Sequence, residues 1–214
     1  RIAPGSTLAG AFTKSSTRAA CILDNQAKLA MGGDAPEGAA IIVNSGNANA
    51  FTGARGQQSV DAVTDAVAQA TGVPAERVFS SSTGVIGEPL PHDRIIAIVD
   101  DLAATLEAGG IADAARAIMT TDTVPKTAVR RGDGWTIGGM AKGAGMLAPQ
   151  LATMLVVLTT DAVVDAATAD AALALGFAVM AAEALGLGVQ KTLDEEIAEL
   201  RASDRVDAEL QELK

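Results

Sequence analysis

The sequence predicts an α/β or α+β fold in which sheets and helices pack in layers. Short apolar or β-branched runs that read as strands are mixed along the chain with longer segments of helical apolar spacing. Hydrophobic residues make up 49% of the 214 residues and charged residues 20%, so the chain can bury a proper core. Aromatic residues are only 2%, so that core must be built from aliphatic side chains.

In the first half of the chain, apolar spacing separates two helices from three strands. One helical face carries Val60, Val63 and Val67, and Gly72 ends that helix. The strand segments are β-branched or loosely alternating. The expected helices are residues 56–71 and 91–106, and the expected strands are residues 8–23, 39–43 and 78–81.

The second half begins with a hairpin and ends in helices. Residues 126–139 read as two strands around a Gly132-Asp133-Gly134 tip. The solid apolar run Leu155 to Leu158 reads as a buried strand. Residues 115–119 are either a short strand or a helix end. The alanine-rich segment 166–185 and the acidic segment 192–214 read as helical.

Composition and charge exclude several classes of function. The formal net charge of −10 argues against nucleic-acid binding, which needs a basic face. With Cys21 and His92 as the single residues of their kinds, neither a disulfide framework nor a zinc site of several such ligands can form within one chain. No apolar run spans a bilayer and no secretory leader opens the sequence, so we expect a cytoplasmic protein without metal, cofactor or membrane.

Three loops of small polar residues could line a site. The string NSGNAN at 44–49 fits either a tight turn after a strand or a polar lining. The pair Thr83-Gly84 could aim a hydroxyl and a backbone N–H at one oxyanion, although such pairs are common in turns. The string TTDT at 120–123 could bind a polar small molecule or cap a helix.

The segment from Gly138 to Asp161 is the most informative part of the sequence. Its glycines suggest backbone brought close to something small, and Lys142 could meet a substrate carboxylate or be a solvated surface lysine. Thr153 follows Ala152 directly before the apolar run, a position that suits a nucleophile held at a strand start. An ordinary loop that enters a core strand would look the same.

Together these segments resemble the ornithine acetyltransferase family, the bifunctional glutamate N-acetyltransferases of arginine biosynthesis. The resemblance runs over roughly residues 1–164, whereas residues 192–214 fit nothing in the family pattern. The matching strings are STLAGAFTKSSTRAA (6–20), NSGNANAFTG (44–53), SSTGVIGEPLP (81–91), AIMTTDTVPK (117–126) and GGMAKGAGMLAPQLATMLVVLTTDA (138–162).

The resemblance implies a layered fold of the kind found in the ornithine acetyltransferase and DmpA-like N-terminal-nucleophile proteins. It also implies self-cleavage between Ala152 and Thr153, which divides the chain into segments 1–152 and 153–214. Thr153 would then be the catalytic nucleophile, with Thr83 and Gly84 stabilising the oxyanion. The substrate would be contacted by Thr120, Lys142 and Thr153, with the neighbouring Thr121 as the alternative to Thr120.

The activity implied is acetyl transfer from N-acetylornithine to glutamate, without a cofactor. The resemblance leaves open whether acetyl-CoA also serves as a donor, and it implies an oligomer of processed chains. Two alternatives remain at this point. One is a hydrolase on the same scaffold, with water as the acceptor. The other is a truncated, non-catalytic relative that kept the loops.

Overall fold

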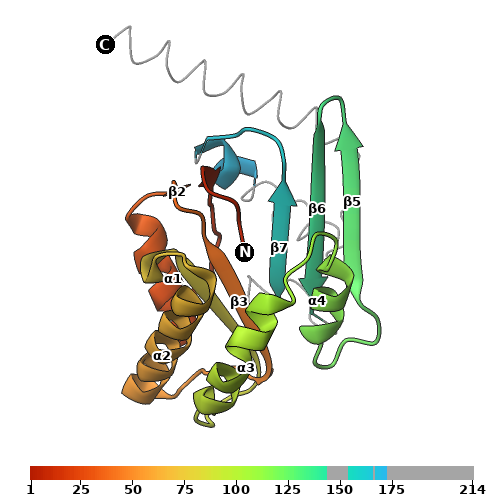
Figure 1. The fold of residues 1–214 in the computed structure, drawn as a ribbon. Helices are drawn as coiled ribbons and strands as arrows, with labels where there is room; N and C mark the ends of the chain where they lie inside the picture. Colours follow the sequence, from red (N-terminus) through yellow and green to blue (C-terminus); the bar gives the residue numbers. More distant parts are fainter. Residues whose placement is uncertain (144–153, 166, 173–214) are drawn as a thin grey trace, which may run out of the picture.

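The computed structural model describes residues 1–143, 154–165 and 167–172, and in these it shows a layered α+β architecture. Strands β3 (Ala40–Asn47) and β4 (Val78–Val85) pair in parallel. Strands β5 (Lys126–Gly132), β6 (Trp135–Lys142) and β7 (Leu155–Thr160) form an antiparallel sheet. Figure 1 shows the helices beside β3 on one side of the molecule and the antiparallel sheet on the other. The predicted fold class is confirmed.

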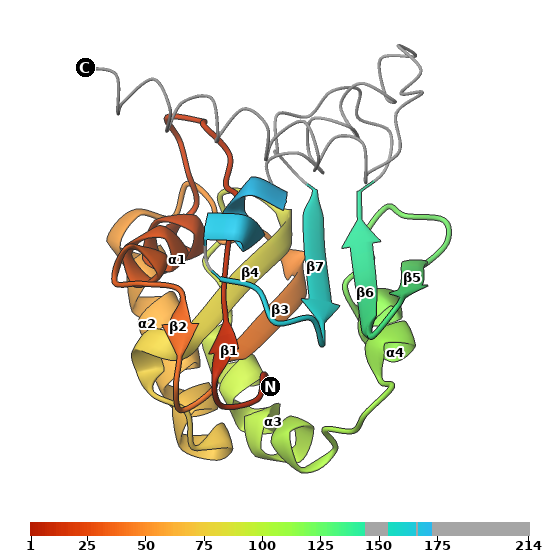
Figure 2. The ribbon, with the colours of Figure 1, turned by 90° about the horizontal axis from the view of Figure 1, so that it is seen from above.

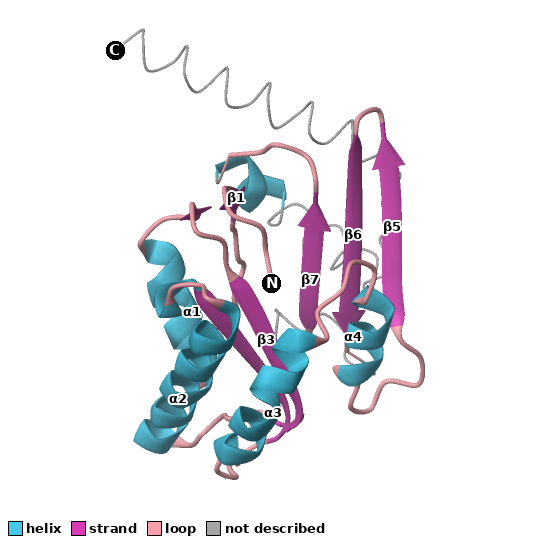
Figure 3. Ribbon diagram, viewed as in Figure 1, coloured by secondary structure: helices cyan, strands magenta, loops and turns pink. Residues whose placement is uncertain are grey.

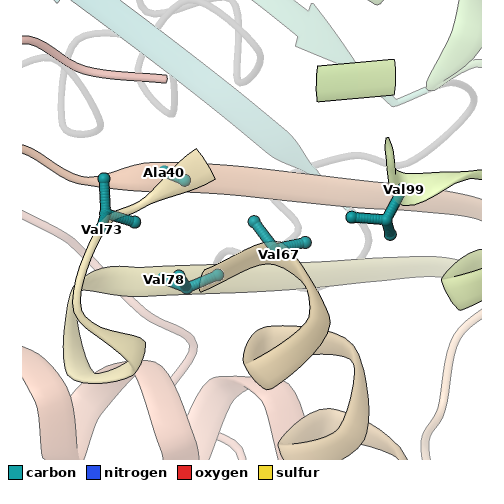
Figure 4. Packing of buried hydrophobic residues seen from close by; sticks show 5 residues of the cluster. All are labelled: Ala40, Val67, Val73, Val78 and Val99. Carbon is teal, nitrogen blue, oxygen red and sulfur yellow. The ribbon is translucent and has the colours of Figure 1, made fainter. Parts of the chain in front are cut away.

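Three helices pack beside the parallel pair: α1 (Ala20–Ala30), α2 (Gly53–Thr71) and α3 (His92–Ala104). Helix α2 contacts α1, α3 and both strands, so it lies at the centre of this layer (Figure 3). The predicted helices over 56–71 and 91–106 are confirmed, and Gly72 ends α2 with a φ of 70°. The core between helices and strands is aliphatic, as expected; Figure 4 shows its buried cluster of Ala40, Val67, Val73, Val78 and Val99.

The prediction of a strand over residues 8–23 is wrong. The short strand β1 (Ser6–Thr7) ends just before this segment and pairs with β2 (Asp34–Ala35), and α1 begins inside the segment, at Ala20. The buried face of α1 carries Asn25 and Lys28. Asn25 exchanges hydrogen bonds with the backbone of Ser80, and Lys28 Nζ donates to the carbonyl of Val78 at 2.8 Å. Polar side chains thus occupy the buried face of this helix and bind the open edge of β4. For that reason the sequence of the helix shows no apolar stripe.

Both parallel strands extend further than predicted. Residues 44–47 continue β3, and Thr83-Gly84 lies inside β4, with Ser45 opposite Thr83 and Gly46 opposite Gly84. The ladder is prolonged by side chains: Ser82 Oγ donates to Asn44 Oδ1 at 2.6 Å, and Asn44 Nδ2 donates to the carbonyl of Asn47. The NSGNAN string is therefore mostly strand, not a turn that follows one.

The predicted hairpin is confirmed and longer than expected. Strand β6 runs on to Lys142, so this lysine lies at a strand end and not inside a glycine-rich loop. Gly139 is in the same strand, and a Cβ there would lie 2.6 Å from Leu158 Cδ2, so this glycine makes room for a neighbouring side chain, not for a ligand. The run Leu155–Leu158 does form a strand, β7, but the expectation that it is buried is wrong, because Leu158 is 55% exposed.

The remaining elements surround the ends of these strands. Helix α4 (Ile111–Ala117) packs on β5 and β6. Of the two alternatives for residues 115–119, the structure therefore shows the helix end and not the short strand. The short helix η1 (Ala75–Arg77) precedes β4. Figure 2 shows β7 as the strand of the antiparallel sheet that lies toward β3 and β4. Residues 167–172 are helical, in line with the prediction for 166–185. The rest of segment 166–185, and the segment 192–214, lie outside the described residues.

Candidate functional site

The ammonium group of Lys142 brings together residues from three distant parts of the chain. Lys142 is 4% exposed, and its Nζ donates to Thr83 Oγ1 at 2.9 Å and to Thr120 Oγ1 at 2.8 Å. Thr83 comes from β4, Thr120 from the segment after α4, and Lys142 from the end of β6. The reading of Lys142 as a solvated surface lysine is therefore wrong.

The two threonine hydroxyls keep their own protons for a further acceptor. A lysine ammonium can only donate, so both hydroxyl oxygens accept from it. Among the described residues, neither Thr83 Oγ1 nor Thr120 Oγ1 has another hydrogen-bond partner. Thr83 is 7% exposed, whereas Thr120 and Thr121 lie at the surface. The cluster is thus a buried cation with two oriented hydroxyls, open to solvent on the side of Thr120.

A buried carboxylate, Asp122, accompanies the ammonium. Its Oδ1 accepts from Lys126 Nζ at 2.6 Å and from the amide of Gly143 at 2.8 Å, and its Oδ2 lies 4.0 Å from Lys142 Nζ. Burial by itself raises the pKa of Asp122, but the bonds from Lys126 and from the amides of Gly143 and Thr120 outweigh it and lower the pKa to about 2. Asp122, Lys126 and Lys142 together carry one net positive charge at neutral pH, which suits an anionic ligand.

Gly84 follows Thr83 in the sequence and has a steric reason to be glycine. Its φ is 136°, and a Cβ there would lie 2.5 Å from the carbonyl oxygen of Gly46 and 2.6 Å from the nitrogen of Asn47. The ladder also shifts register at Asn47, which pairs with both Thr83 and Val85. This irregularity ends the pairing of β3 with β4 next to Thr83, and Gly84 lies at the exposed end of β4.

The asparagines of the NSGNAN string serve the backbone. Asn47 Nδ2 donates to the carbonyls of Glu88 and Pro89, and Asn49, which is 0% exposed, donates to the carbonyl of Gly56. A small pocket elsewhere in the molecule is lined by Asn44, several serines and apolar side chains of α2 and α3, and includes none of Thr83, Thr120 and Lys142. The string thus holds the end of β3 and the start of α2 in place.

The predicted nucleophile Thr153 and the predicted cleavage partner Ala152 lie outside the described residues. Their described neighbour in the chain is Met154, which precedes β7. A Cβ placed at Gly143 would lie 3.7 Å from Met154 Cα, and Lys142 pairs with Leu155 across the sheet. The described chain therefore ends β6 at Lys142 and begins β7 directly beside it, at Leu155.

Sequence reasoning did not assign Asp122 to the site. Its carboxylate was visible in the TTDT string, but its partners Gly143 and Lys142 are distant in sequence and only the fold brings them near. Among the described residues, no group of three or more His, Cys, Asp and Glu side chains could hold a metal ion. None of the helices in the described ranges is long and apolar enough to cross a membrane.

Comparison with known proteins finds relatives that are named as proteins of arginine biosynthesis. It is 58% identical over 166 residues to the arginine biosynthesis bifunctional protein ArgJ of Ruegeria pomeroyi, a match that covers 76% of this chain and 40% of that protein. It is 50% identical over 173 residues to ArgJ 1 of Streptomyces clavuligerus, covering 78% of this chain and 44% of that protein. The chain therefore spans less than half the length of these curated relatives.

The structure is also similar to a solved one. The crystal structure of ornithine acetyltransferase complexed with ornithine from Mycobacterium tuberculosis superposes with a TM-score of 0.61 at 40% sequence identity, covering 73% of this chain and 80% of that chain. The family model described as ArgJ family matches residues 2–179. This match extends over most of the sequence and agrees with the relatives and the fold, so the chain belongs to the ArgJ family.

Proposed function

We propose that the protein transfers an acetyl group from N-acetylornithine to glutamate in arginine biosynthesis, through a threonine nucleophile. Its relatives are named as bifunctional proteins of arginine biosynthesis, and the similar mycobacterial structure is an ornithine acetyltransferase that holds ornithine. The reaction occurs in the cytoplasm in an oligomer of processed chains. It needs no cofactor, since both half-reactions are acyl transfers.

The observation that carries this proposal is the buried ammonium of Lys142 with its two threonine hydroxyls. N-acetylornithine and glutamate share an α-carboxylate, which a lysine meets as a point charge. The net positive charge of the Asp122, Lys126 and Lys142 cluster favours that anion, and the exposed Thr120 lies on the open side. One contact then serves both half-reactions.

Thr153 is the nucleophile in this proposal, and cleavage after Ala152 creates its free α-amine. An α-amine has a pKa of about 8, so near neutral pH it can accept the proton of the hydroxyl on the same residue. The hydroxyl oxygen attacks the acetyl carbon of N-acetylornithine, the C–N bond breaks, and ornithine leaves with the proton. The amine of glutamate then attacks the acyl-threonine ester and restores the hydroxyl.

Thr83 and Gly84 stabilise the negative oxygen that forms in each step. The hydroxyl of Thr83 accepts a bond from a cation, which strengthens its own O–H as a donor. The backbone N–H of Gly84 would be the second donor, at the exposed end of β4. Such donors act most strongly where water is excluded, and Thr83 is 7% exposed.

Two further observations support cleavage beside Thr153. Met154, the next residue, lies against Gly143 and thus beside Lys142. The match to the crystallised mycobacterial chain covers 73% of this chain and 80% of that chain. The match to the Ruegeria relative covers 76% of this chain but only 40% of that protein. The crystallised chain is therefore much shorter than the Ruegeria relative. A processed chain would have that property.

Mass spectrometry combined with a transfer assay tests this function. The purified protein should be cut at Ala152-Thr153, Thr153→Ala should remain one chain, and Thr159→Ala, which removes an exposed threonine hydroxyl of β7, should be cut like the wild type. Acetyl-labelled N-acetylornithine should yield labelled N-acetylglutamate when glutamate is present. Release of free acetate with or without glutamate would show a hydrolase instead, and an intact, inactive chain would contradict both.

A further inference from the structure

Asp122 is a buried carboxylate that takes no part in the proposed acyl transfer. It lies between α4 and β5, and its side chain is 0% exposed. It accepts hydrogen bonds from three residues: the amide of Gly143 at 2.8 Å, Lys126 Nζ at 2.6 Å, and, more weakly, the amide of Thr120 at 3.4 Å. The carboxylate is therefore fixed relative to the end of β6.

The contact between Asp122 and Lys142 is one of charge and not a direct hydrogen bond. Oδ2 of Asp122 lies 4.0 Å from Lys142 Nζ, whereas the two threonine hydroxyls lie within 2.9 Å of it. The hydroxyls thus accept the ammonium's hydrogen bonds, and the carboxylate supplies the opposite charge. A buried ammonium without such a charge would move toward solvent or lose its proton.

Asp122 keeps its negative charge in the conditions in which an enzyme works. Its donors hold the pKa at about 2, below the ordinary value of 3.8. The site therefore presents a fixed negative charge 4.0 Å from the Lys142 ammonium. Of the two lysines near it, Lys126 has a side chain that is 43% exposed, whereas that of Lys142 is only 5% exposed. Solvent screens the first pair far more than the second.

The place of the ammonium decides the direction of two hydroxyl protons. While Lys142 donates to Thr83 and Thr120, both hydroxyls must direct their own protons elsewhere. If the ammonium left, either hydroxyl could rotate and its proton could point away from the open side. The orientation of the proposed oxyanion donor Thr83 thus depends on Asp122 through Lys142.

We propose that Asp122 is a positioning residue of the site, which holds the Lys142 ammonium where it meets both threonine hydroxyls and the substrate carboxylate. This role rests on the proposed function only for the identity of the ligand, an amino acid with a free α-carboxylate. The placement of Lys142 by Asp122 is a property of the free protein and can be measured without any ligand.

The first experiment measures how fast Lys142 reacts with acetic anhydride, by peptide mass spectrometry of the purified protein. Asp122→Asn keeps the shape but removes the charge, so Lys142 should be labelled roughly tenfold faster than in the wild type. Asp161→Asn is the matched control, because Asp161 also accepts a backbone amide, that of Thr136 in the same sheet, at an exposed position. An unchanged rate at Lys142 in Asp122→Asn would overturn the proposal.

The second experiment is a double-mutant cycle on ornithine affinity, measured by calorimetry. Asp122→Asn and Lys142→Met should each weaken binding by roughly tenfold or more. If Asp122 acts through Lys142, adding Asp122→Asn to Lys142→Met should change affinity by less than about twofold. Additive losses would show a general structural role and would overturn the proposal.

Two further results keep these tests decisive. If Asp122→Asn does not fold, Asp122→Glu takes its place in the double-mutant cycle; it keeps the charge but displaces it, and its loss of affinity should likewise disappear in the Lys142→Met background. A wild-type protein that fails to bind ornithine would contradict the proposed function alone, because the labelling of Lys142 still tests its placement.

Discussion

The ammonium of Lys142, at the end of β6, lies 2.9 Å from the hydroxyl of Thr83, near the end of β4. This bond joins the parallel pair to the antiparallel sheet. Both groups are buried, Lys142 at 4% exposed and Thr83 at 7% exposed, so this bond is shielded from solvent. The two sheets thus meet at the residues that we propose for substrate binding and oxyanion stabilisation.

Replacing Thr83 by valine should slow acylation by roughly a hundredfold or more, because it removes one donor to the oxyanion while it keeps the branched shape. Affinity for N-acetylornithine should change much less. Single-turnover acylation, followed by rapid quench, measures the rate. Thr64→Val, at a buried hydroxyl of α2 that bonds the carbonyl of Asp61, is the control. An unchanged acylation rate would remove Thr83 from the mechanism.

Replacing Lys142 by methionine should raise KM for N-acetylornithine and for glutamate alike, each by roughly tenfold or more, because one cation serves both carboxylates. Steady-state kinetics with each substrate varied in turn gives the two values. Lys14→Met, at an exposed lysine, should leave both unchanged. A defect confined to one substrate would refute the shared contact.

Replacing Gly84 by alanine should destabilise the protein by at least about 2 kcal/mol, because the new Cβ meets the backbone of Gly46 and Asn47 and the φ of 136° is strained for alanine. Gly87→Ala is the matched control: its φ is 87°, but a Cβ there meets nothing within 4 Å. Urea unfolding of both variants gives the free energies. Equal losses would mean that strain alone, and not the close approach to β3, requires glycine at position 84.

Stability should depend on Asp122 at acid pH. The folded pKa of about 2 lies below the ordinary 3.8, so the charged carboxylate stabilises the fold above about pH 4, and this contribution disappears as the pH falls from about 4 to 2. The charged groups that face it are Lys126 and Lys142.

Thermal melts from pH 7 to pH 2 of wild type and Asp122→Asn test this dependence. The wild type should be the more stable above pH 4, and the difference should shrink below it. A difference that stays constant across the whole range would show that the charge of Asp122 does not matter.

The sequence alone predicted α2 and α3, left residues 115–119 open between a short strand and a helix end, and missed α1. Its buried face includes Asn25 and Lys28, which bind the edge of β4 through side-chain hydrogen bonds. A helix whose inner face bonds backbone and not apolar side chains has no periodic signal to detect. In α2, by contrast, Val60, Val63 and Val67 face the core, and the helix was found nearly to its ends.

The site could be predicted only in part. Thr83, Thr120 and Lys142 were expected to share a site, and the structure brings their side chains together, while their roles stay predictions. The burial of Lys142 and its pairing with Asp122 could not be predicted, because both depend on how β6 returns past the segment after α4. Thr153 lies outside the described residues, so its role stays a prediction.

The most direct test of the account is to find the acetyl group on Thr153. The processed protein is mixed with N-acetylornithine without glutamate, quenched in acid and examined by intact and peptide mass spectrometry. We expect one acetyl group per active site, on the peptide that begins with Thr153, with an equal amount of ornithine released, and loss of the label when glutamate is added. Transfer without any covalent acetyl-protein, or a label on another residue, would contradict the threonine mechanism.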